Sequence, residues 1–469
     1  MNTAEETMEL APWTATVPHG WRVTRLDAVA DVLFSNVDKH TLDDEDPVRL
    51  CNYVDVYKND RITSRIEFME ASADAREVRK FQIRRGDVLA TKDSETADDI
   101  AIPSLVADEL PGVLCGYHLA MIRPRLVEVE GAFLGWLHAS KSFRAQYEAK
   151  AVGVTRFGLS QYAFRAARVP VPPLPEQQRI AAYLDASCAV IDTAVAAKRR
   201  QLETLESLRK SIIQRAVTRG ITEGVELEST GNVWMEQIPI GWKLVCLKRI
   251  AEIQGGLTLG KQYEGPLIER PYLRVGNVQD GHFDLEDVSV IELPADVAPG
   301  VELRPGDVLM TEGGDLDKLG RGHVWNGEIP GCLHQNHIFA VRCFLRKLKP
   351  MFLAYVTAAK YGRDYFEATG KKTTNLACTN ATKVGQFPIP LPSLAEQETI
   401  CAYLEKRLGE VKATVTGIQA QITTLTAYRK SLIHEYVTGQ RRITEAEVRA
   451  IQERMSKVAD TTTLTPSYG

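Results

Sequence analysis

The chain has 469 residues, which is too long for one hydrophobic core and predicts about two to four domains. Its apolar content of 44% and charged content of 25% are ordinary globular values and exclude wholesale disorder. The net charge of −4 excludes a uniformly basic nucleic-acid-binding chain. Local clusters of Lys and Arg could still face phosphates, because DNA affinity depends on such clusters rather than on the whole-chain sum.

The cysteine pattern and the N-terminus indicate a reduced cellular compartment. None of the eight cysteines forms a Cys-x-x-Cys pair, and their spacing does not suggest a disulfide framework. The opening MNTAEETMEL lacks the basic and apolar regions of a secretory signal. We find no run of about 18 apolar residues for a membrane span. We therefore expect a soluble, cytoplasmic protein.

An internal repeat dominates the organisation of the chain. Four long blocks and the tripeptide Ile-Thr-Glu recur in the same order, each displaced by about 220 residues. The matched blocks are VPHGWRVTRLDAV (17–29) and IPIGWKLVCLKRI (238–250), RRGDVLATKD (84–93) and RPGDVLMTEG (304–313), YHLAMIRP (117–124) and NHIFAVRC (336–343), and VPVPPLPEQQRIAAYLD (169–185) and IPLPSLAEQETICAYLE (389–405). The segments between the blocks differ freely, so the scaffold repeats while the intervening surface varies.

The first part of each copy is predicted to be a compact α+β domain. FQIRRGDVLAT (81–91) and VELRPGDVLMT (301–311) are each typical of a strand, a turn at Gly-Asp and a second strand. Apolar spacing near 3.6 residues then predicts helices in 131–149 and 349–368.

A long helix is predicted after the Pro-rich stop in each copy, since Pro suits only the first turn of a helix. The helices should cover about 176–218 and 396–438, roughly 65 Å each at 1.5 Å per residue. A heptad pattern predicts a coiled-coil seam, interrupted once by Lys198. The seam positions are Leu184, Ile191, Leu205, Ile212, Leu404, Val411, Ile418, Leu425 and Leu432.

The expected fold class is therefore α+β: a tandem duplication of a mixed domain followed by a long helix. The two long helices should pack as an antiparallel coiled coil, related by pseudo-two-fold symmetry. We expect mixed domains over 1–169 and 220–387, the second including a linker, long helices over 170–219 and 388–440, and a C-terminal tail over 441–469, which should begin with a short helix.

Motifs for chemistry are scarce. GKKT at 370–373 lacks the upstream Gly of a phosphate-binding loop, and GGDLDKLGRG at 313–322 lacks the dinucleotide fingerprint. Cys332, His334 and His337 could suggest zinc, but the first copy has no matching cysteine. We predict no catalytic residue, no metal and no cofactor in this chain.

Two small-residue loops before the Pro-rich segments are the best candidates for contact with DNA phosphates or base edges. The loops at 152–160 and 369–376 supply the predicted DNA-binding residues Thr155, Arg156, Lys371, Lys372 and Thr373. Thr91, Lys92 and Arg321, which lie outside these loops, are further candidates. For each of them a solvated charged turn remains the alternative. The run 198–200 (Lys-Arg-Arg) fits a solvated helix face better than a contact with DNA or a partner.

PPLPEQQRIAAYLD at 172–185, PSLAEQETICAYLE at 392–405, each Pro-x-Gly-Trp opening, and RKSII and RKSLI at 209–213 and 429–433 resemble the conserved regions of specificity subunits of type I restriction–modification systems. The resemblance extends from about 17 to 445. It implies that each mixed domain is a target-recognition domain, that the two domains read the halves of a split, asymmetric DNA sequence, and that the long helices set the gap between the halves.

The resemblance also implies partners: double-stranded DNA, two modification subunits that methylate adenine with S-adenosylmethionine, and restriction subunits that use ATP and Mg²⁺. Two other hypotheses stay open at this point. A two-headed scaffold that brackets protein partners without reading DNA would share the repeat and the long helices. A self-contained methyltransferase or nuclease would need a cofactor motif that the sequence does not supply.

Overall fold

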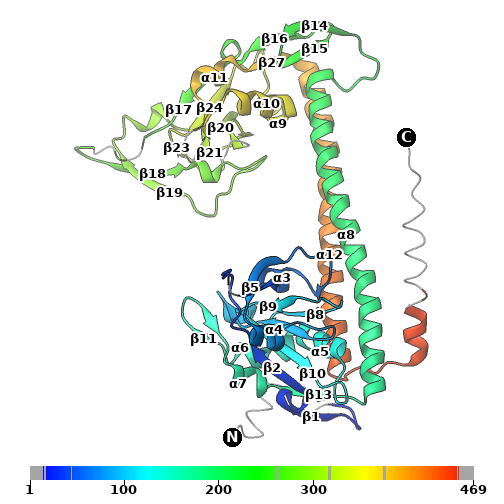
Figure 1. Cartoon of the computed structure of the whole chain (residues 1–469). Coiled ribbons are helices and arrows are strands. Elements are labelled where there is room, and N and C mark those ends of the chain that lie inside the picture. The colour runs from blue at the N-terminus through cyan, green and yellow to red at the C-terminus, as the bar shows by residue number, and fades with distance from the viewer. Residues whose placement is uncertain are drawn as a thin grey trace. The chain divides into compact units, whose positions relative to one another are not determined.

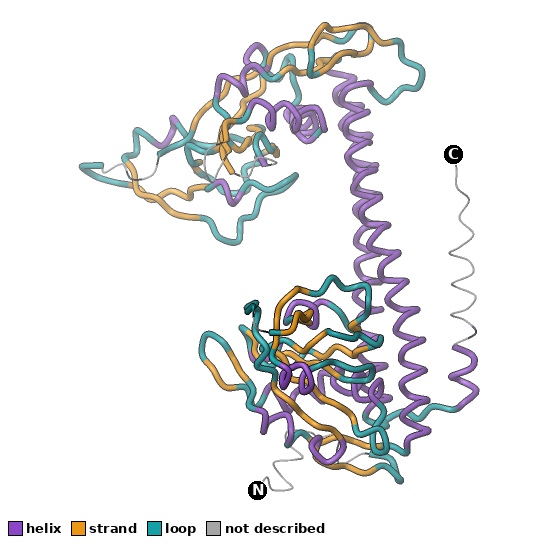
Figure 2. Tube along the Cα trace, viewed as in Figure 1, coloured by secondary structure: helices purple, strands orange, loops and turns teal. Residues whose placement is uncertain are grey.

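The structure is a computed structural model that describes residues 14, 17–43, 45–258, 260, 263–314, 318–372, 377–451 and 453 (Figure 1). The chain divides into two compact units. Unit 1 comprises Met1–Lys198 and Ala420–Gly469, and unit 2 comprises Arg199–Gln419. Each unit therefore contains one mixed domain and one part of both long helices (Figure 2).

The mixed domain of unit 1 is built on a five-stranded sheet of order β2-β10-β6-β8-β4, a three-stranded sheet of order β5-β3-β9, and the small sheet β11-β12-β7. Its elements are β1 Arg22–Arg25, α2 Leu26–Val29, β2 Ala30–Phe34, β3 Asp46–Cys51, α3 Tyr53–Lys58, β4 Arg61–Ile62, β5 Met69–Ala73, α4 Ala75–Phe81, β6 Val88–Thr91, β7 Asp93–Ser94, β8 Pro103–Val106, β9 Val113–Cys115, β10 Leu119–Pro124, α5 Gly131–Ala139, α6 Lys141–Glu148, β11 Val152–Gly153, β12 Phe157–Gly158, α7 Gln161–Arg165 and β13 Arg168–Val171.

The mixed domain of unit 2 has sheets of order β17-β24-β20-β22, β19-β18-β23 and β21-β26-β25, which match those of unit 1 except that β4 has no counterpart among the described residues. It adds the hairpin β14–β15 in front. Its elements are β14 Leu227–Asn232, β15 Met235–Pro239, β16 Lys243–Cys246, β17 Ala251–Gly255, β18 Ile268–Leu273, β19 Ser289–Leu293, β20 Asp307–Thr311, β21 Gly313–Gly314, β22 Gly322–Val324, β23 Leu333–His334, β24 Ile338–Cys343, α9 Pro350–Ala358, α10 Lys360–Thr369, β25 Lys371–Lys372, β26 Ala377–Cys378, α11 Ala381–Gln386 and β27 Pro388–Leu391. The matching sheet orders and pairing directions confirm the predicted duplication.

The predicted strand–turn–strand at each Gly-Asp is only half right. A strand follows the turn in both copies, but the residues before it make only the isolated bridges of Gln82 and Glu302. The turn is held instead by its aspartate. The Asp87 carboxylate accepts hydrogen bonds from the Arg84 amide (2.9 Å) and from the Arg123 guanidinium (2.7 and 3.0 Å). Asp307 makes the same contacts in unit 2, with the Arg304 amide and the Arg342 guanidinium.

The two long helices are α8, Leu174–Arg219, and α12, Leu394–Val437, close to the predicted ends. In unit 1, Leu184 and Ile191 of α8 share a core with Leu432 and Ile433 of α12. The start of α8 therefore packs against the end of α12.

In unit 2 the end of α8 packs against the start of α12, because Ile213 and Val217 of α8 share a core with Ile400 and Leu404 of α12. The helices are thus antiparallel, as predicted.

The burial of the helix residues follows the predicted heptads. Leu184, Ile191, Leu404 and Leu432 are buried where the mixed domains also cover the helices. Along the middle, the seam residues are half-buried and most of their neighbours are exposed; these seam residues are Val195, Lys198, Leu202, Leu205, Val411, Val415, Ile418, Ile422 and Leu425. Lys198, which interrupts the apolar pattern, donates a hydrogen bond from Nζ to Gln421 Oε1. A polar contact therefore replaces an apolar one at that step of the seam.

By composition, α8 is long and apolar enough to cross a membrane, with a mean hydropathy of 1.5 over 18 residues, which the sequence analysis did not expect. Packing accounts for this composition. Leu184, Cys188 and Ile191 of α8 lie in the core of unit 1.

The seam predicts different effects for two matched substitutions. Ile191→Asp places a carboxylate in a site that is only 6% exposed and should cost about 3 kcal/mol or more. Val411→Asp, at a half-buried position, should cost about 1 kcal/mol because water can reach the carboxylate. Circular dichroism measures the melting temperature of each variant. The exposed Lys412→Asp is the control and should have little effect. Equal melting curves for all three variants and the wild type would contradict the coiled coil.

Candidate nucleic-acid interface

A tryptophan anchors the start of each long helix to its mixed domain. Trp21 of the first Pro-x-Gly-Trp opening donates from Nε1 to Glu176 Oε2 (3.1 Å), and Trp242 of the second donates to Glu396 Oε1 (3.1 Å). The glycine before each tryptophan has a φ of +91°, a conformation that favours glycine. The Gly-Trp pair is therefore retained for a turn that aims the indole at the helix.

The glutamine of each Glu-Gln pair fastens the helix to backbone groups. Gln177 accepts from the Glu130 amide (2.8 Å) and donates to the carbonyls of Glu128 (3.2 Å) and Pro172 (2.8 Å). Gln397 makes the corresponding three bonds to Lys349, Lys347 and Pro392, at 2.9, 2.9 and 3.0 Å. Both glutamines have no exposed surface, so these bonds satisfy polar groups that water does not reach.

The Pro-rich segment before each helix is a strand, which the sequence analysis missed. β13 pairs antiparallel with β1, and β27 pairs antiparallel with β16, directly after the tryptophan of each copy. Proline is tolerated because each sheet has only two strands, so both strands are edges. The Pro-rich pattern had indicated only a helix stop.

The glycine that follows the other long helix also contacts the Pro-x-Gly-Trp segment of each copy. Gly439, after α12, has a φ of +76° and lies so close to Pro18 that a Cβ would clash there. Gly220, after α8, has a φ of +71°, and a Cβ there would meet Trp242 at 3.5 Å. Each tryptophan thus lies between the start of one long helix and the end of the other, a contact set that we call the anchor.

The Arg-Lys-Ser motif near the end of each helix holds the mixed domain of the other copy. Arg429 of α12 contacts Asp60 (2.5 Å) and Asp192 (3.0 Å) and lies over the Trp136 ring. Arg209 of α8 contacts Asp280 at 3.6 Å.

The two anchors differ in one ion pair. Arg442, after α12, makes a bidentate contact with Glu176 at 2.9 and 3.0 Å. Glu176 is 3% exposed, so this guanidinium compensates a buried carboxylate. Beyond Arg442, Thr444 and Glu447 form a capping box in front of a helical segment at 445–451, as expected for the tail. The tail from 454 onward lies outside the described residues.

The anchor predicts a specific loss of stability. Glu176→Ala removes the acceptor of Trp21 and the partner of Arg442, which should lower stability by about 2 kcal/mol. Gln178→Ala, an exposed neighbour on the same helix, is the matched control and should have little effect. Differential scanning calorimetry measures both. Indistinguishable melting temperatures would show that the anchor contributes nothing.

The predicted loop residues of the first copy converge on one small sheet. β12 pairs with both β11 and β7, so the hairpin that carries Thr155 and Arg156 lies beside Lys92 and Asp93. Thr155 and Arg156 are exposed, and Val154 at the tip is 93% exposed.

Below the tip, Asp93 bonds the Lys92 ammonium (3.0 Å) and His118 Nδ1 (2.8 Å). Burial raises the pKa of Asp93, but the contacts with His118 and Lys92 outweigh it, so the carboxyl is held below its usual range. Arg156 Nη2 approaches His118 Nδ1 at 3.5 Å.

Thr91 does not belong to this surface. It has no exposed area, and its hydroxyl accepts the amide hydrogen of Ile102 at 3.0 Å. Because Thr91 lies in the buried strand β6, its hydroxyl bonds the neighbouring backbone and does not face solvent.

The second copy presents a matching sheet of order β21-β26-β25. Lys371 is exposed on β25, and Arg321 is half-buried at the end of the loop before β22. The side chain of Lys372 and the whole of Thr373 lie outside the described residues.

Sequence reasoning missed a carboxylate–histidine pair at this place in both copies. His337 Nδ1 contacts Glu312 Oε2 at 2.8 Å, as His118 contacts Asp93. The histidines end the matched Tyr-His and Asn-His pairs, and each acid follows a matched Gly-Asp strand, so the repeat itself carried the signal. In the aligned blocks Glu312 corresponds to Lys92 and not to Asp93, so the two acids occupy positions one residue apart and do not align.

The two histidines near Cys332 have other contacts. His334 Nδ1 contacts the Ile338 carbonyl (3.0 Å), while His337 contacts Glu312. Within the described ranges, no three His, Cys, Asp or Glu side chains gather in a way that could hold a metal ion.

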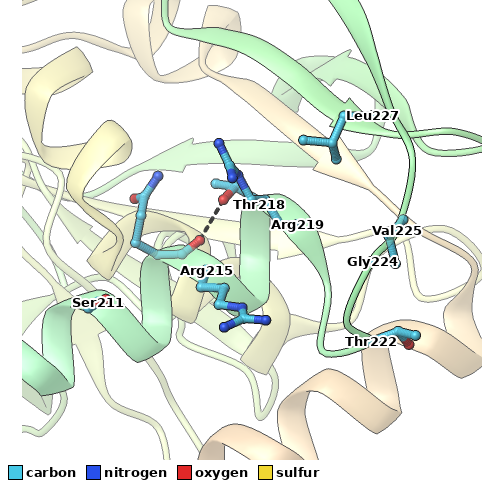
Figure 3. A pocket seen from close by; sticks show the side chains of 9 residues that line it. Ser211, Arg215, Thr218, Arg219, Thr222, Gly224, Val225 and Leu227 are labelled. Carbon is cyan, nitrogen blue, oxygen red and sulfur yellow. Dashed lines mark hydrogen bonds between the residues drawn. The ribbon is translucent and has the colours of Figure 1, made fainter.

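A polar pocket of about 480 Å³ lies in unit 2 at the end of α8 (Figure 3). Ser211, Arg215 and Thr218 line it, and the Thr218 hydroxyl donates to the Gln214 carbonyl at 2.7 Å. Arg215 contacts Glu223 at 3.6 Å. None of the predicted DNA-binding residues lines this pocket.

The sequence and the fold are similar to those of known proteins. Residues 19–204 match the family described as type I restriction modification DNA specificity domain. Two solved structures share the fold. One, from a study of the complex assembly and conformational transition of the type I R-M system, has a TM-score of 0.68 at 20% identity over 90% of this chain and 98% of that one. The HsdS subunit from Thermoanaerobacter tengcongensis has a TM-score of 0.51 at 19% identity over 91% and 98%.

The sequence is also similar to several curated specificity subunits. The chain is 23% identical to the EcoKI specificity subunit of Escherichia coli K12 over 67% of this chain and 66% of that protein. It is 24% identical to the EcoBI specificity subunit of Escherichia coli over 62% of each. The matches thus span slightly less than two thirds of these two relatives. A putative MjaX specificity subunit of Methanocaldococcus jannaschii is 22% identical over 91% and 95%. Residues 19–204 thus match the model of the type I restriction specificity domain, and the chain is similar to type I specificity subunits over most of its length.

Proposed function

We propose that this chain is a sequence-specific DNA-recognition subunit that reads a bipartite, asymmetric target and directs adenine methylation and restriction by partner subunits. One observation carries the proposal. The repeated motifs form the anchors, the helix pair and the base of each small sheet, whereas the segments that differ between the copies carry exposed basic side chains there, Arg156 in unit 1 and Lys371 in unit 2. Two copies of one scaffold with different loops suit two different half-sites.

The chemistry of the first small sheet supports DNA reading. An exposed Arg at a hairpin tip can make paired hydrogen bonds to a guanine edge, and an exposed Val can contact a thymine methyl group. Asp93 and His118 stabilise the base of the hairpin, so less side-chain freedom is lost on binding. The Lys371 ammonium suits phosphate contact in the second unit.

In this proposal the chain is not an enzyme. The two modification subunits bind S-adenosylmethionine and transfer the methyl group, and restriction subunits, where present, use ATP and Mg²⁺. Lys198, Arg199 and Arg200 belong to the helix pair and are not assigned to DNA. The complex acts on DNA in the cytoplasm.

A two-headed scaffold that brackets protein partners is the alternative. It accounts for the anchors and the helices equally well. It gives no reason for the loops to differ while an Arg or Lys is retained, nor for the match to a DNA specificity domain over 19–204.

Arg156→Ala tests the function directly. If Arg156 reads a base, the variant should lose about 1–3 kcal/mol of discrimination at one base pair of one half-site and leave the other half-site intact. The measurement is the methylated motif in cells that co-express the chain with its modification subunits. Arg125→Ala, an exposed arginine paired with Asp31, is the control and should leave the motif unchanged. An Arg156→Ala motif equal to that of the wild type would remove the hairpin from the interface.

A second prediction concerns the long helices as a spacer. Inserting four residues after Ala197 and after Gly417 should lengthen each helix by about 6 Å while nearly preserving its apolar face. The same two half-sites should then be methylated with an unread gap longer by about one to two base pairs. The methylated motif again reports the result. An active variant with an unchanged gap would mean that the partner subunits set the distance.

A further inference from the structure

A crevice of about 230 Å³ in unit 1 is lined by four basic side chains. It lies where α5 and β8 meet the last turns of α12, with Trp136 in its wall. Its basic residues are Arg61, Arg144, Arg429 and Lys430, and the acidic residue among them is Asp60.

Two of these cations are already compensated by carboxylates of the chain. Arg429 contacts Asp60 and Asp192, and Arg61 contacts Asp185. Arg144 and Lys430 make no ion pair with a residue that the structure describes. The Nε and Nη1 atoms of Arg144 are buried and have no hydrogen-bond partner within the described part of the chain. Burial lowers the pKa of Arg144, which marks an environment unfavourable to the charge.

The repeat supplies an internal comparison. The counterpart of Arg144 is Arg363 on α10, which contacts Asp280 at 3.1 Å. The counterpart of Lys430 is Lys210 on α8, which contacts Glu206 at 3.6 Å. In unit 2 an acid therefore forms an ion pair with each of these positions. In unit 1 the carboxylates of Asp99 and Glu148 act on Arg144 electrostatically, but neither forms an ion pair with Arg144 or Lys430 within the described residues.

We propose that Arg144 and Lys430 bind a phosphate-class oxyanion in the crevice of unit 1, either free phosphate or a backbone phosphate of DNA. A phosphate oxygen accepts hydrogen bonds from a guanidinium and an ammonium at once. Water alone would satisfy the N–H groups but not the two neighbouring charges. The DNA form of the proposal rests on the proposed function, and the free-phosphate form does not.

The first experiment follows thermal unfolding of the full chain in sodium phosphate and in sodium chloride at equal ionic strength. If free phosphate binds, phosphate should raise the melting temperature of the wild type by about 2–4 °C over chloride. Arg144→Gln and Lys430→Gln should lose this shift. Arg363→Gln and Lys210→Gln, the matched controls in unit 2, should keep it.

The second experiment measures DNA affinity of the chain assembled with its modification subunits as a function of salt. If the ligand is a backbone phosphate, Arg144→Gln and Lys430→Gln should each flatten the slope of log K against log salt by up to about 0.9, and the unit 2 controls should not. An unchanged slope together with no phosphate-specific stabilisation would overturn the inference. If Arg144→Gln does not fold, the exposed Lys430→Gln decides alone. A complex that binds no DNA contradicts the proposed function, and the phosphate experiment then decides the inference by itself.

Discussion

The hydrogen bond between a tryptophan indole and a buried or half-buried glutamate at the start of a long helix is the contact on which each unit depends. Around it, the adjacent glutamine fastens the helix to two backbone segments of the mixed domain, and a left-handed glycine brings in the end of the other helix. Because each anchor needs the start of one copy's helix and the end of the other's, neither copy can complete its own unit. The antiparallel packing of the helices follows from this requirement.

The anchors also explain where the sequence is free to change. Side chains in the anchors are buried and hydrogen-bonded to specific partners, so their replacement is costly. The small sheets at the ends of the Gly-Asp strands use short strands, the tip of the first one is exposed, and the connecting segments carry different residues in the two copies. A rigid scaffold with replaceable loops is what reading two unlike DNA half-sites requires. The modest net charge is compatible with this function, because only the loops need to face phosphates.

The sequence predicted the large features because their signals are periodic or repeated. The heptads placed Leu184, Ile191, Leu404 and Leu432 at a seam that the structure buries, and the matched blocks predicted the shared topology. It did not predict the strand character of the Pro-rich segments, because proline normally argues against a paired strand and the partner strand is more than 100 residues away in the chain. The carboxylate–histidine pairs were missed for a related reason. Pairing of Asp93 with His118 is set by strand register, which no local pattern encodes. Thr91 was predicted to contact DNA because it precedes Lys92 in the sequence, but it occupies the last position of a buried strand.

The central claim is that two units built on one scaffold read two different DNA half-sites. Methylation-aware sequencing of DNA from cells that express this chain with its modification subunits, in a host without other adenine methyltransferases, tests it most directly. The account predicts one motif made of two unlike specified halves separated by a gap of fixed length and unspecified sequence, with a methylated adenine in each half. A contiguous motif, two identical halves, or no motif that depends on this chain would contradict it.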